Sequence, residues 1–330
     1  MRRLMTTVEP RHSPGDRVTI AEAADAYVAA AERRGRKPNT IRLVRSDVRN
    51  HIGPYFGGRS IAAVERHEVG EFVIALERKG LAPKTVRNAA ATLSAVYTFA
   101  AHPDRRWAVT NPCIGVDLPA IPERSEIRFL TVAQVRELVG HVPDGACRDV
   151  DRVMILTAAM SGLRKGELLG LRWEDIDWPA QRIRVRRAFT RGVMATPKSR
   201  QGTRSVPLSD ELARELTALR EASRWQADAD LVFSHPQTGT VQSDSKITAR
   251  FHAALDAAGL PRRRFHDLRH SFGTAMAGAG VPLRTLQAWM GHANFQTTLI
   301  YSDYSPSEHE ADLVARAFSS SRSSSHSEGT

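Results

Sequence analysis

Four short segments in the second half of the chain hold polar side chains whose types and spacing could do chemistry. They read "SGLRKGELLG", "TPKSRQG", "RRRFHDLRHSF" and "MGHANFQTTLIYSDY". Each one combines cations, imidazoles or a phenol with glycine or with a helical pattern. The residues of interest are Arg164, Glu167, Lys198, His266, Arg269, His270, His292 and Tyr301.

Arg164 is the first unusual residue, because it follows a glycine turn and opens a short amphipathic helix. The helix dipole disfavours a cation at that end. An exposed pair with Glu167, three residues on, would contribute only about 0.2–0.5 kcal/mol, which does not explain the arginine. Lys198 lies in a basic, glycine-bearing connection, where a lysine taken alone is ordinarily a surface residue.

His266, Arg269 and His270 fall at i, i+3 and i+4 and so share one helix face. The two histidines could bind zinc, but the segment lacks the glutamate of an H-E-x-x-H site, and Arg269 would put a cation beside the metal. An anion suits His266 and Arg269 better, because both donate hydrogen bonds and arginine grips phosphate oxygens with two parallel bonds. We therefore expect an anion site and no metal.

Together these side chains form a donor-rich set without a carboxylate cluster, which favours a bound phosphate. No cysteine or serine in the four segments has a base beside it, so a tyrosine hydroxyl is the expected nucleophile. The ordinary pKa of a phenol is near 10. We expect the arginines and protonatable imidazoles to favour the phenolate and to stabilise a phosphorane. Tyr301 and Tyr304 are both candidates at this point.

The elements that must position these residues are mostly helical, with a small antiparallel sheet. Thr131 and Gln134 form a capping box, and an apolar helical run stops at Gly162. Alternation at 181–189 predicts a strand, with 203–208 as its partner and "PKSRQG" in the connection. The remaining patterns predict a helix at 209–223, a short strand at 231–235 and four further helical segments up to Phe318.

The first part of the chain has helical periodicity alone and a basic face. Thr19 and Glu22 form a capping box for its first helix. Within 39–52 the apolar residues fall on one stripe and the arginines on a neighbouring stripe, turned by about 100°. The apolar stripe holds Ile41, Val44, Val48 and Ile52. The candidate DNA-binding residues are Arg42, Arg45, Arg49, Lys84 and Arg87.

Charge supports a nucleic-acid partner. The chain has 330 residues and a net charge of +11, and residues 1–120 hold 19 Lys and Arg against 12 Asp and Glu. Such an excess repels itself in a compact state, so a polyanionic partner explains it better than an unspecialised basic surface. A basic helix surface that is merely solvated remains the alternative.

Other features of the sequence indicate where in the cell the protein is expected. Two cysteines are too few for a disulfide framework, and the first residues contain no apolar signal segment. The longest apolar run, near 153–160, is too short to span a bilayer. We expect a cytoplasmic, nucleoid-associated protein without a membrane partner. Disorder is expected at 1–15 and in the serine-rich tail 319–330, and a proline-rich linker at 113–126.

The ordered set of motifs resembles the tyrosine recombinase (phage integrase) family over nearly all of residues 127–318. A Gly-His pair follows the His-x-x-Arg box by 23 residues, and a tyrosine follows that histidine by nine. Each motif alone is weak, but their order is specific. Residues 16–112 resemble the helical core-binding domain of the family more loosely. The matched residues are Gly162-Leu163-Arg164 with Glu167, Lys198, His266 to His270, Gly291-His292 and Tyr301.

The resemblance implies a role for each matched residue. Arg164, His266, Arg269 and His292 would bind and polarise the scissile phosphate. Glu167 would orient Arg164, and Lys198 would protonate the departing 5′-oxygen. Tyr301 would attack and form a 3′-phosphotyrosyl bond, so that no metal or ATP is needed. Tyr304, one helical turn away, is the alternative if the register differs.

The resemblance also implies the architecture: two domains clamp a DNA duplex, and four protomers assemble on two sites. An apolar stripe in 306–318 would pack either on its own domain or on a neighbouring protomer. Two other functions stay open, a regulator that binds DNA without catalysis and a type IB topoisomerase. The target sequence, an accessory directionality factor and the choice among integration, excision, dimer resolution and transposition cannot be deduced from the sequence.

Overall fold

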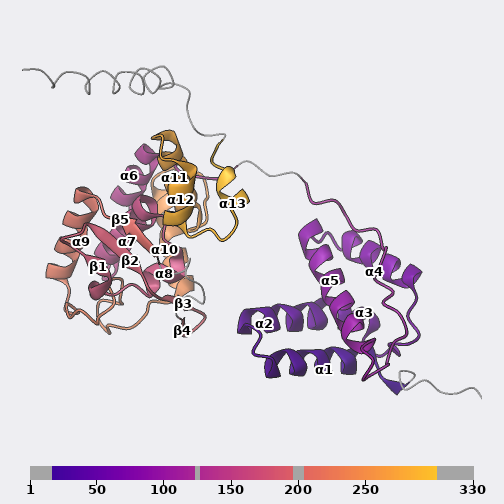
Figure 1. Cartoon of the computed structure of the whole chain (residues 1–330). Coiled ribbons are helices and arrows are strands. Elements are labelled where there is room, and N and C mark those ends of the chain that lie inside the picture. Colours follow the sequence, from indigo (N-terminus) through magenta and orange to yellow (C-terminus); the bar gives the residue numbers. More distant parts are fainter. Residues whose placement is uncertain (1–16, 123–126, 196–203, 303–330) are drawn as a thin grey trace, which may run out of the picture. The chain divides into compact units, whose positions relative to one another are not determined.

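Two compact units, 1–125 and 126–330, make up the chain in a computed structural model that describes residues 17–122, 127–195 and 204–302. Figure 1 shows helices in both units and strands in the second. The predicted fold class, mainly helical with a small antiparallel sheet, is confirmed. The predicted disordered ends, Lys198, Tyr304 and the apolar stripe at 306–318 lie outside the described residues.

The first unit is a helical bundle around an aromatic core. The predicted capping box starts its first helix, with the Thr19 N–H donating to Glu22 at 2.8 Å and the Glu22 N–H donating to Thr19 at 3.2 Å. Phe56, Phe72 and Tyr97 are fully buried in its core. Its helices are α1 (Ile20–Arg33), α2 (Pro38–Asp47), α3 (Gly53–Phe56), α4 (Arg66–Arg78) and α5 (Pro83–Ala100).

The segment predicted as one amphipathic helix over 39–52 contains a π-helical turn, Val48–Ile52, between α2 and α3. A π turn holds more residues than an α turn, so an α-helical stripe does not continue through it. Of the predicted apolar stripe, Ile52 is buried whereas Ile41, Val44 and Val48 are half-buried. The stripe was therefore only partly right.

The second unit is built around α7 (Arg148–Ser161), whose core-facing residues include Met154 and Ile155. Helix α11 (Asp267–Gly278) packs along α7. The predicted capping box of Thr131 and Gln134 starts α6 (Val132–Gly140). The other helices are α8 (Lys165–Leu169), α9 (Asp210–Ala222), α10 (Asp244–Ala257), α12 (Leu283–Met290) and α13 (Gln296–Leu299).

The predicted antiparallel pair is confirmed, since β2 (Arg182–Val185) pairs with β5 (Arg204–Pro207). A short strand, β1 (Ile176–Asp177), completes this sheet in the order β1-β2-β5. The strand predicted over 181–189 is shorter than expected, since β2 ends at Val185 and the chain continues into a second hairpin. Between them, Arg187 pairs with Asp175 at 2.9 Å. That hairpin joins β3 (Ala188–Thr190) to β4 (Val193–Ala195).

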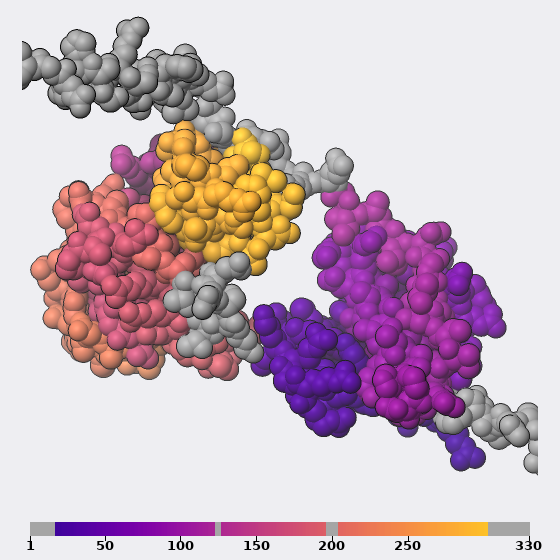
Figure 2. Space-filling view, viewed as in Figure 1, coloured from indigo at the N-terminus to yellow at the C-terminus, as the bar shows by residue number. Residues whose placement is uncertain are grey.

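The strand predicted at 231–235 is wrong, because residues 231 and 234 form only isolated bridges, to Arg172 and Val241. None of the described helices combines the length and apolar character needed to cross a membrane. In Figure 2 the surface of the second unit is shared by early segments, in pink tones, and late segments, in orange and yellow. Residues far apart in the sequence therefore meet at one surface.

Candidate active site

The ends of two helices organise the site. Helix α7 ends at Gly162, as predicted, and α12 ends at Gly291, both in the left-handed conformation with φ of 66° and 63°. The last carbonyls of a helix have no partner inside it and attract cations. A Cβ at residue 162 would lie 2.5 Å from the Phe272 ring, so glycine is required there by packing as well as by φ.

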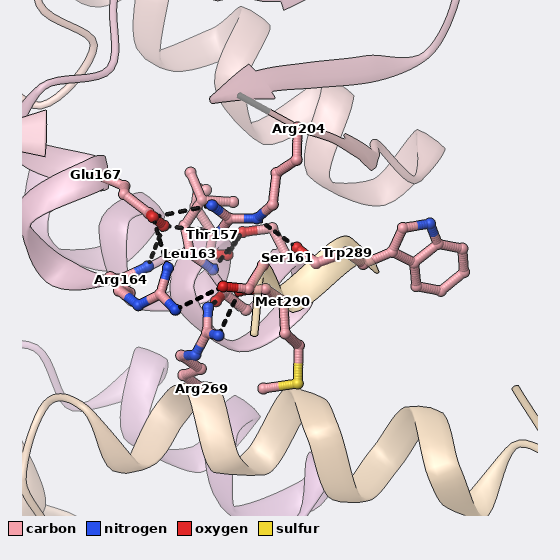
Figure 3. Close-up of polar contacts among 11 residues, drawn as sticks. Thr157, Ser161, Leu163, Arg164, Glu167, Arg204, Arg269, Trp289 and Met290 are labelled. Carbon is pink, nitrogen blue, oxygen red and sulfur yellow. Dashed lines mark hydrogen bonds and ion pairs between the residues drawn. The ribbon is translucent and has the colours of Figure 1, made fainter. Parts of the chain in front are cut away.

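Arginine side chains satisfy these carbonyls. Arg269, from the first turn of α11, donates from Nη1 to the Gly162 carbonyl at 2.5 Å and from Nη2 to the Met290 carbonyl. Arg164 donates from Nη2 to the Gly291 carbonyl at 3.0 Å. Both guanidinium groups therefore lie at the ends of α7 and α12 (Figure 3).

Glu167 links a third arginine to this set. Its carboxylate accepts two hydrogen bonds from Arg204, at 2.9 and 2.7 Å, and one from Arg164 Nη1 at 2.9 Å. It also accepts the backbone N–H of Arg164 at 2.8 Å, which starts α8. Burial alone would raise the pKa of Glu167, but the hydrogen bonds and charge of Arg204, with those of Arg164, lower it to about 2.

Arg204 lies in β5, and sequence reasoning missed it. Its side chain is 5% exposed, and its Nε donates to the Trp289 carbonyl of α12 at 2.6 Å. It therefore ties the sheet to α8 and to α12, as Figure 3 shows. The available signal was an arginine two residues after the basic connection that holds Lys198, but the neighbouring arginines gave the same signal.

The arginine set, Arg164, Arg204 and Arg269, carries three positive charges against the single carboxylate of Glu167. Arg269 is 3% exposed, and burial with the neighbouring arginines lowers its pKa to about 9, so it stays charged at neutral pH. The side chain of Arg164 is 41% exposed and remains open to a ligand. The excess charge and the guanidinium donors suit a phosphate.

The two predicted phosphate-binding histidines are neutral at pH 7, because the pKa of each imidazole is lowered. Desolvation by the surrounding protein, with the charges of His270 and Arg269, lowers the pKa of His266 to about 4, although the residue as a whole is exposed. Burial and the charge of Arg269 lower the pKa of His292 to about 3. A neutral imidazole still donates one hydrogen bond to a phosphate oxygen. Nδ1 of His292 is 2.9 Å from the Thr298 hydroxyl, which fixes the ring.

Tyr301 is 1% exposed and follows α13. Its hydroxyl lies 2.9 Å from Nδ1 of His270. Burial raises the pKa of Tyr301 to about 12, although Arg269 acts in the opposite direction. The expectation of a favoured phenolate is therefore wrong, because desolvation outweighs the nearby cation.

The zinc alternative gains no ligand set. The rings of His266 and His270 lie 5.5 Å apart between centroids. Within residues 17–122, 127–195 and 204–302, no three His, Cys, Asp or Glu side chains gather closely enough to hold a metal ion. The expectation of a metal-free site stays a prediction.

The candidate DNA-binding residues lie in the first unit and are mostly exposed. Arg42, Arg49 and Lys84 are exposed, while Arg87 donates to the Pro119 carbonyl at 3.1 Å. Arg45 pairs with Glu32 at 2.8 Å. The structure contains no DNA, so contact between these residues and DNA stays a prediction.

Comparisons with known proteins agree with this fold. The phage integrase family model matches residues 128–308. The chain is 25% identical over 322 residues to the tyrosine recombinase XerC-like protein of Caldanaerobacter subterraneus subsp. tengcongensis, covering 88% of this chain and 81% of the relative.

Solved structures share the fold. The Tn1549 transposon integrase in complex with transposon right end DNA has a TM-score of 0.73 at 23% identity, covering 91% of this chain and 99% of that one. A lambda integrase tetramer bound to a Holliday junction has a TM-score of 0.67 at 18% identity, covering 87% and 83%. The family model matches more than half of the 330 residues of this chain, so the protein belongs to the phage integrase, or tyrosine recombinase, family.

Proposed function

We propose that this protein is a site-specific DNA recombinase that cuts and rejoins DNA through a 3′-phosphotyrosyl bond to Tyr301, without metal or ATP. The observation that carries the proposal is the arginine set gathered on two helix ends beside a buried tyrosine. That combination offers a phosphate its donors and a nucleophile from the same unit. Family membership supports the same reaction class.

In the proposed cleavage step, Arg164, Arg269, His266 and His292 bind the scissile phosphate and stabilise the charge that develops on it. Preorganised donors of this kind stabilise the transition state because they need no reorganisation when the charge forms. Arg204 and Glu167 hold Arg164 and the end of α12 in place.

Each step forms one phosphoester bond for each one that it breaks, so no external energy source is needed. The Tyr301 oxygen forms a bond to phosphorus while the bond from phosphorus to the 5′-oxygen breaks. Lys198 supplies the proton to the 5′-oxygen, a transfer typically worth about 10²–10⁴-fold in rate. In the reverse step, a 5′-hydroxyl from another strand attacks the phosphotyrosine and releases Tyr301.

The proposed partner is a double-stranded recombination site bound by a homotetramer on two sites. Residues 16–112 would form the core-binding domain, with its basic residues on the DNA backbone, and 113–126 the linker to a catalytic domain at 127–318. A helix at 306–318 would exchange between protomers, and an accessory factor would set direction. The neighbours solved on transposon DNA and as a tetramer on a Holliday junction support a DNA partner and the assembly of several protomers by analogy.

The first step of the test identifies the DNA sequence that the protein cleaves. The full chain is incubated with restriction fragments of the DNA that flanks its own gene, and fragments still protein-bound after denaturation are sequenced. A synthetic duplex of that sequence, nicked beside the scissile phosphate, should then trap a covalent complex. Tyr301→Phe should abolish the complex, whereas Tyr304→Phe should keep it.

The same experiment separates the alternatives. A regulator would bind the duplex without covalent capture, and a topoisomerase would relax supercoiled plasmid without a paired site. A covalent complex that survives Tyr301→Phe would overturn the nucleophile assignment.

A further inference from the structure

His270 is the hydrogen-bond partner that the described part of the chain offers the Tyr301 hydroxyl. Its Nδ1 lies 2.9 Å from Oη, and the ring centroids are 6.0 Å apart. Nδ1 accepts this bond when the ring carries its proton on Nε2. His270 follows Arg269 directly in α11, so one helical turn presents both a guanidinium of the arginine set and the partner of the tyrosine.

Gly273 fixes the tyrosine in this position. A Cβ built on Gly273 would lie 2.4 Å from Cζ of Tyr301, so the ring rests directly on the backbone of α11. Residues 270 and 273 are three apart and lie on the same face of the helix. The Tyr301 hydroxyl is therefore held against His270 by the packing of its ring as well as by the hydrogen bond.

Protonation states fit a proton transfer across this contact. Because burial raises the pKa of Tyr301 to about 12, its hydroxyl keeps its proton at neutral pH. Burial also lowers the pKa of His270, so the imidazole is neutral and its Nδ1 is free to accept. Among the charged neighbours, the buried carboxylate of Asp267, one turn earlier on α11, raises the pKa of His270 and favours an imidazolium, whereas Arg264 and Arg269 lower it.

We propose that His270 takes the phenolic proton of Tyr301 as the tyrosine attacks DNA, an inference that rests on the proposed function. The O–H bond of Tyr301 breaks while the bond from Oη to phosphorus forms, and the proton passes to Nδ1. The 5′-oxygen leaves with the electron pair of its bond to phosphorus and receives a proton from Lys198. On rejoining, the imidazolium returns its proton to the phenolate that leaves.

The competing explanation is that the hydrogen bond to His270 holds Tyr301 in an inactive position when DNA is absent. If the hydrogen bond only restrained Tyr301 away from DNA, removing it would speed covalent capture. If His270 accepts the proton, removing it slows capture. The two explanations predict opposite signs.

The experiment measures single-turnover covalent capture of the nicked duplex by the full chain. His270→Ala removes both the bond and the base. His270→Asn keeps an amide oxygen close to the place of Nδ1, so it retains the hydrogen bond but cannot take the proton. We expect both variants to capture DNA about 10²–10⁴-fold more slowly. His235→Asn changes a half-buried histidine outside the site and should leave the rate unchanged.

Added imidazole supplies a base without restoring the side chain. Imidazole should raise the rate of His270→Ala, in proportion to its unprotonated fraction, and leave His270→Asn unchanged, because the amide occupies the space. A thermal unfolding midpoint and a duplex affinity like those of the wild type confirm that each variant is folded. If both histidine variants misfold, Gly273→Ser, which displaces the ring from His270, replaces them and should slow capture equally.

Three results would overturn the inference. They are capture by His270→Ala at or above the wild-type rate, full activity of His270→Asn, and no response to imidazole. If instead the wild type shows no Tyr301-dependent complex, the proposed function fails first and this inference fails with it.

Discussion

The arginines of the two units differ in burial and in their hydrogen-bond partners. In the second unit, the side chains of Arg204 and Arg269 are buried, and their guanidinium groups donate to helix-end carbonyls or to Glu167. In the first unit, Arg42 and Arg49 are exposed, and Arg45 meets Glu32 through side chains that are 61% and 44% exposed. The same residue type is thus part of the fold in one unit and part of a solvated surface in the other.

Solvent explains the difference. A buried charge interacts through a low dielectric and loses its hydration, so its position and partners are fixed. An exposed charge is screened by water and salt, and its pair is worth about 0–1 kcal/mol. Substitutions in the second unit should therefore change chemistry or stability strongly, whereas those in the first unit should change DNA affinity weakly.

Among the substitutions that compare the two units, the largest effect is expected for Arg269→Lys. A lysine has no fork to span the carbonyls of Gly162 and Met290, and loss of one preorganised donor lowers rates by about 10²–10³-fold. Covalent capture of the nicked duplex should fall by that factor. Arg42→Lys is the matched control and should change capture less than threefold. Equal effects of the two changes would break the comparison.

Next is Glu167→Gln, measured by urea unfolding of the second unit. Removing one partner of a buried ion pair costs about 3–5 kcal/mol, so the variant should be less stable by about that much at pH 7. Because the folded pKa is about 2 and the ordinary value is 4.5, this contribution is complete above pH 4.5 and is lost as pH falls toward 2. The difference between variant and wild type should shrink over that window.

The control for this experiment is Glu32→Gln, which removes the exposed partner of Arg45. It should change stability by less than about 1 kcal/mol. A loss at Glu32 as large as that at Glu167 would mean that burial does not decide the value of these pairs.

A glycine in each unit sharpens the same comparison. Gly273→Ala would place its methyl group 2.4 Å from Tyr301, whereas a Cβ at Gly70 in α4 meets nothing within 4 Å. Covalent capture by Gly273→Ala should fall by at least about tenfold, since the tyrosine ring must shift by about 1 Å to regain ordinary van der Waals contact. Gly70→Ala should keep full activity and gain about 0.5–1 kcal/mol of stability, because alanine favours the helix. If Gly273→Ala captured DNA at the wild-type rate, the packing of the Tyr301 ring on Gly273 would not matter for the reaction.

The smallest effect is expected for Arg42→Ala and Arg45→Ala. Each should weaken DNA binding a few-fold on any sequence and reduce the slope of log affinity against log salt by about 0.9 per lost phosphate contact. Fluorescence anisotropy with specific and random duplexes at several salt concentrations measures both quantities. A change confined to the specific duplex would mean that these residues read bases.

Local rules carried much of the prediction. The capping boxes at Thr19 and Thr131, the helix stop at Gly162 and the pairing of β2 with β5 depend on neighbouring residues or on period, and the structure confirms them. The π turn at Val48–Ile52 and the hairpin of β3 and β4 were missed. Neither feature is encoded by the apolar periodicity from which the helix and the strand were predicted.

The site divides in the same way. Residue types, their order and the helix face shared by His266, Arg269 and His270 followed from the sequence alone. The sequence could not distinguish Arg204 from its basic neighbours, and it suggested His266 rather than Tyr301 as the partner of His270, since Tyr301 is 31 residues away.

By itself the sequence therefore determined which chemistry is available: donors for a phosphate and one phenol within a family pattern. Only the tertiary structure decided the electrical state of those groups. It buried the phenol, kept the imidazoles neutral and joined Arg204 to Glu167. The reason is physical, because desolvation depends on what surrounds a side chain, and residues distant in the sequence supply those surroundings.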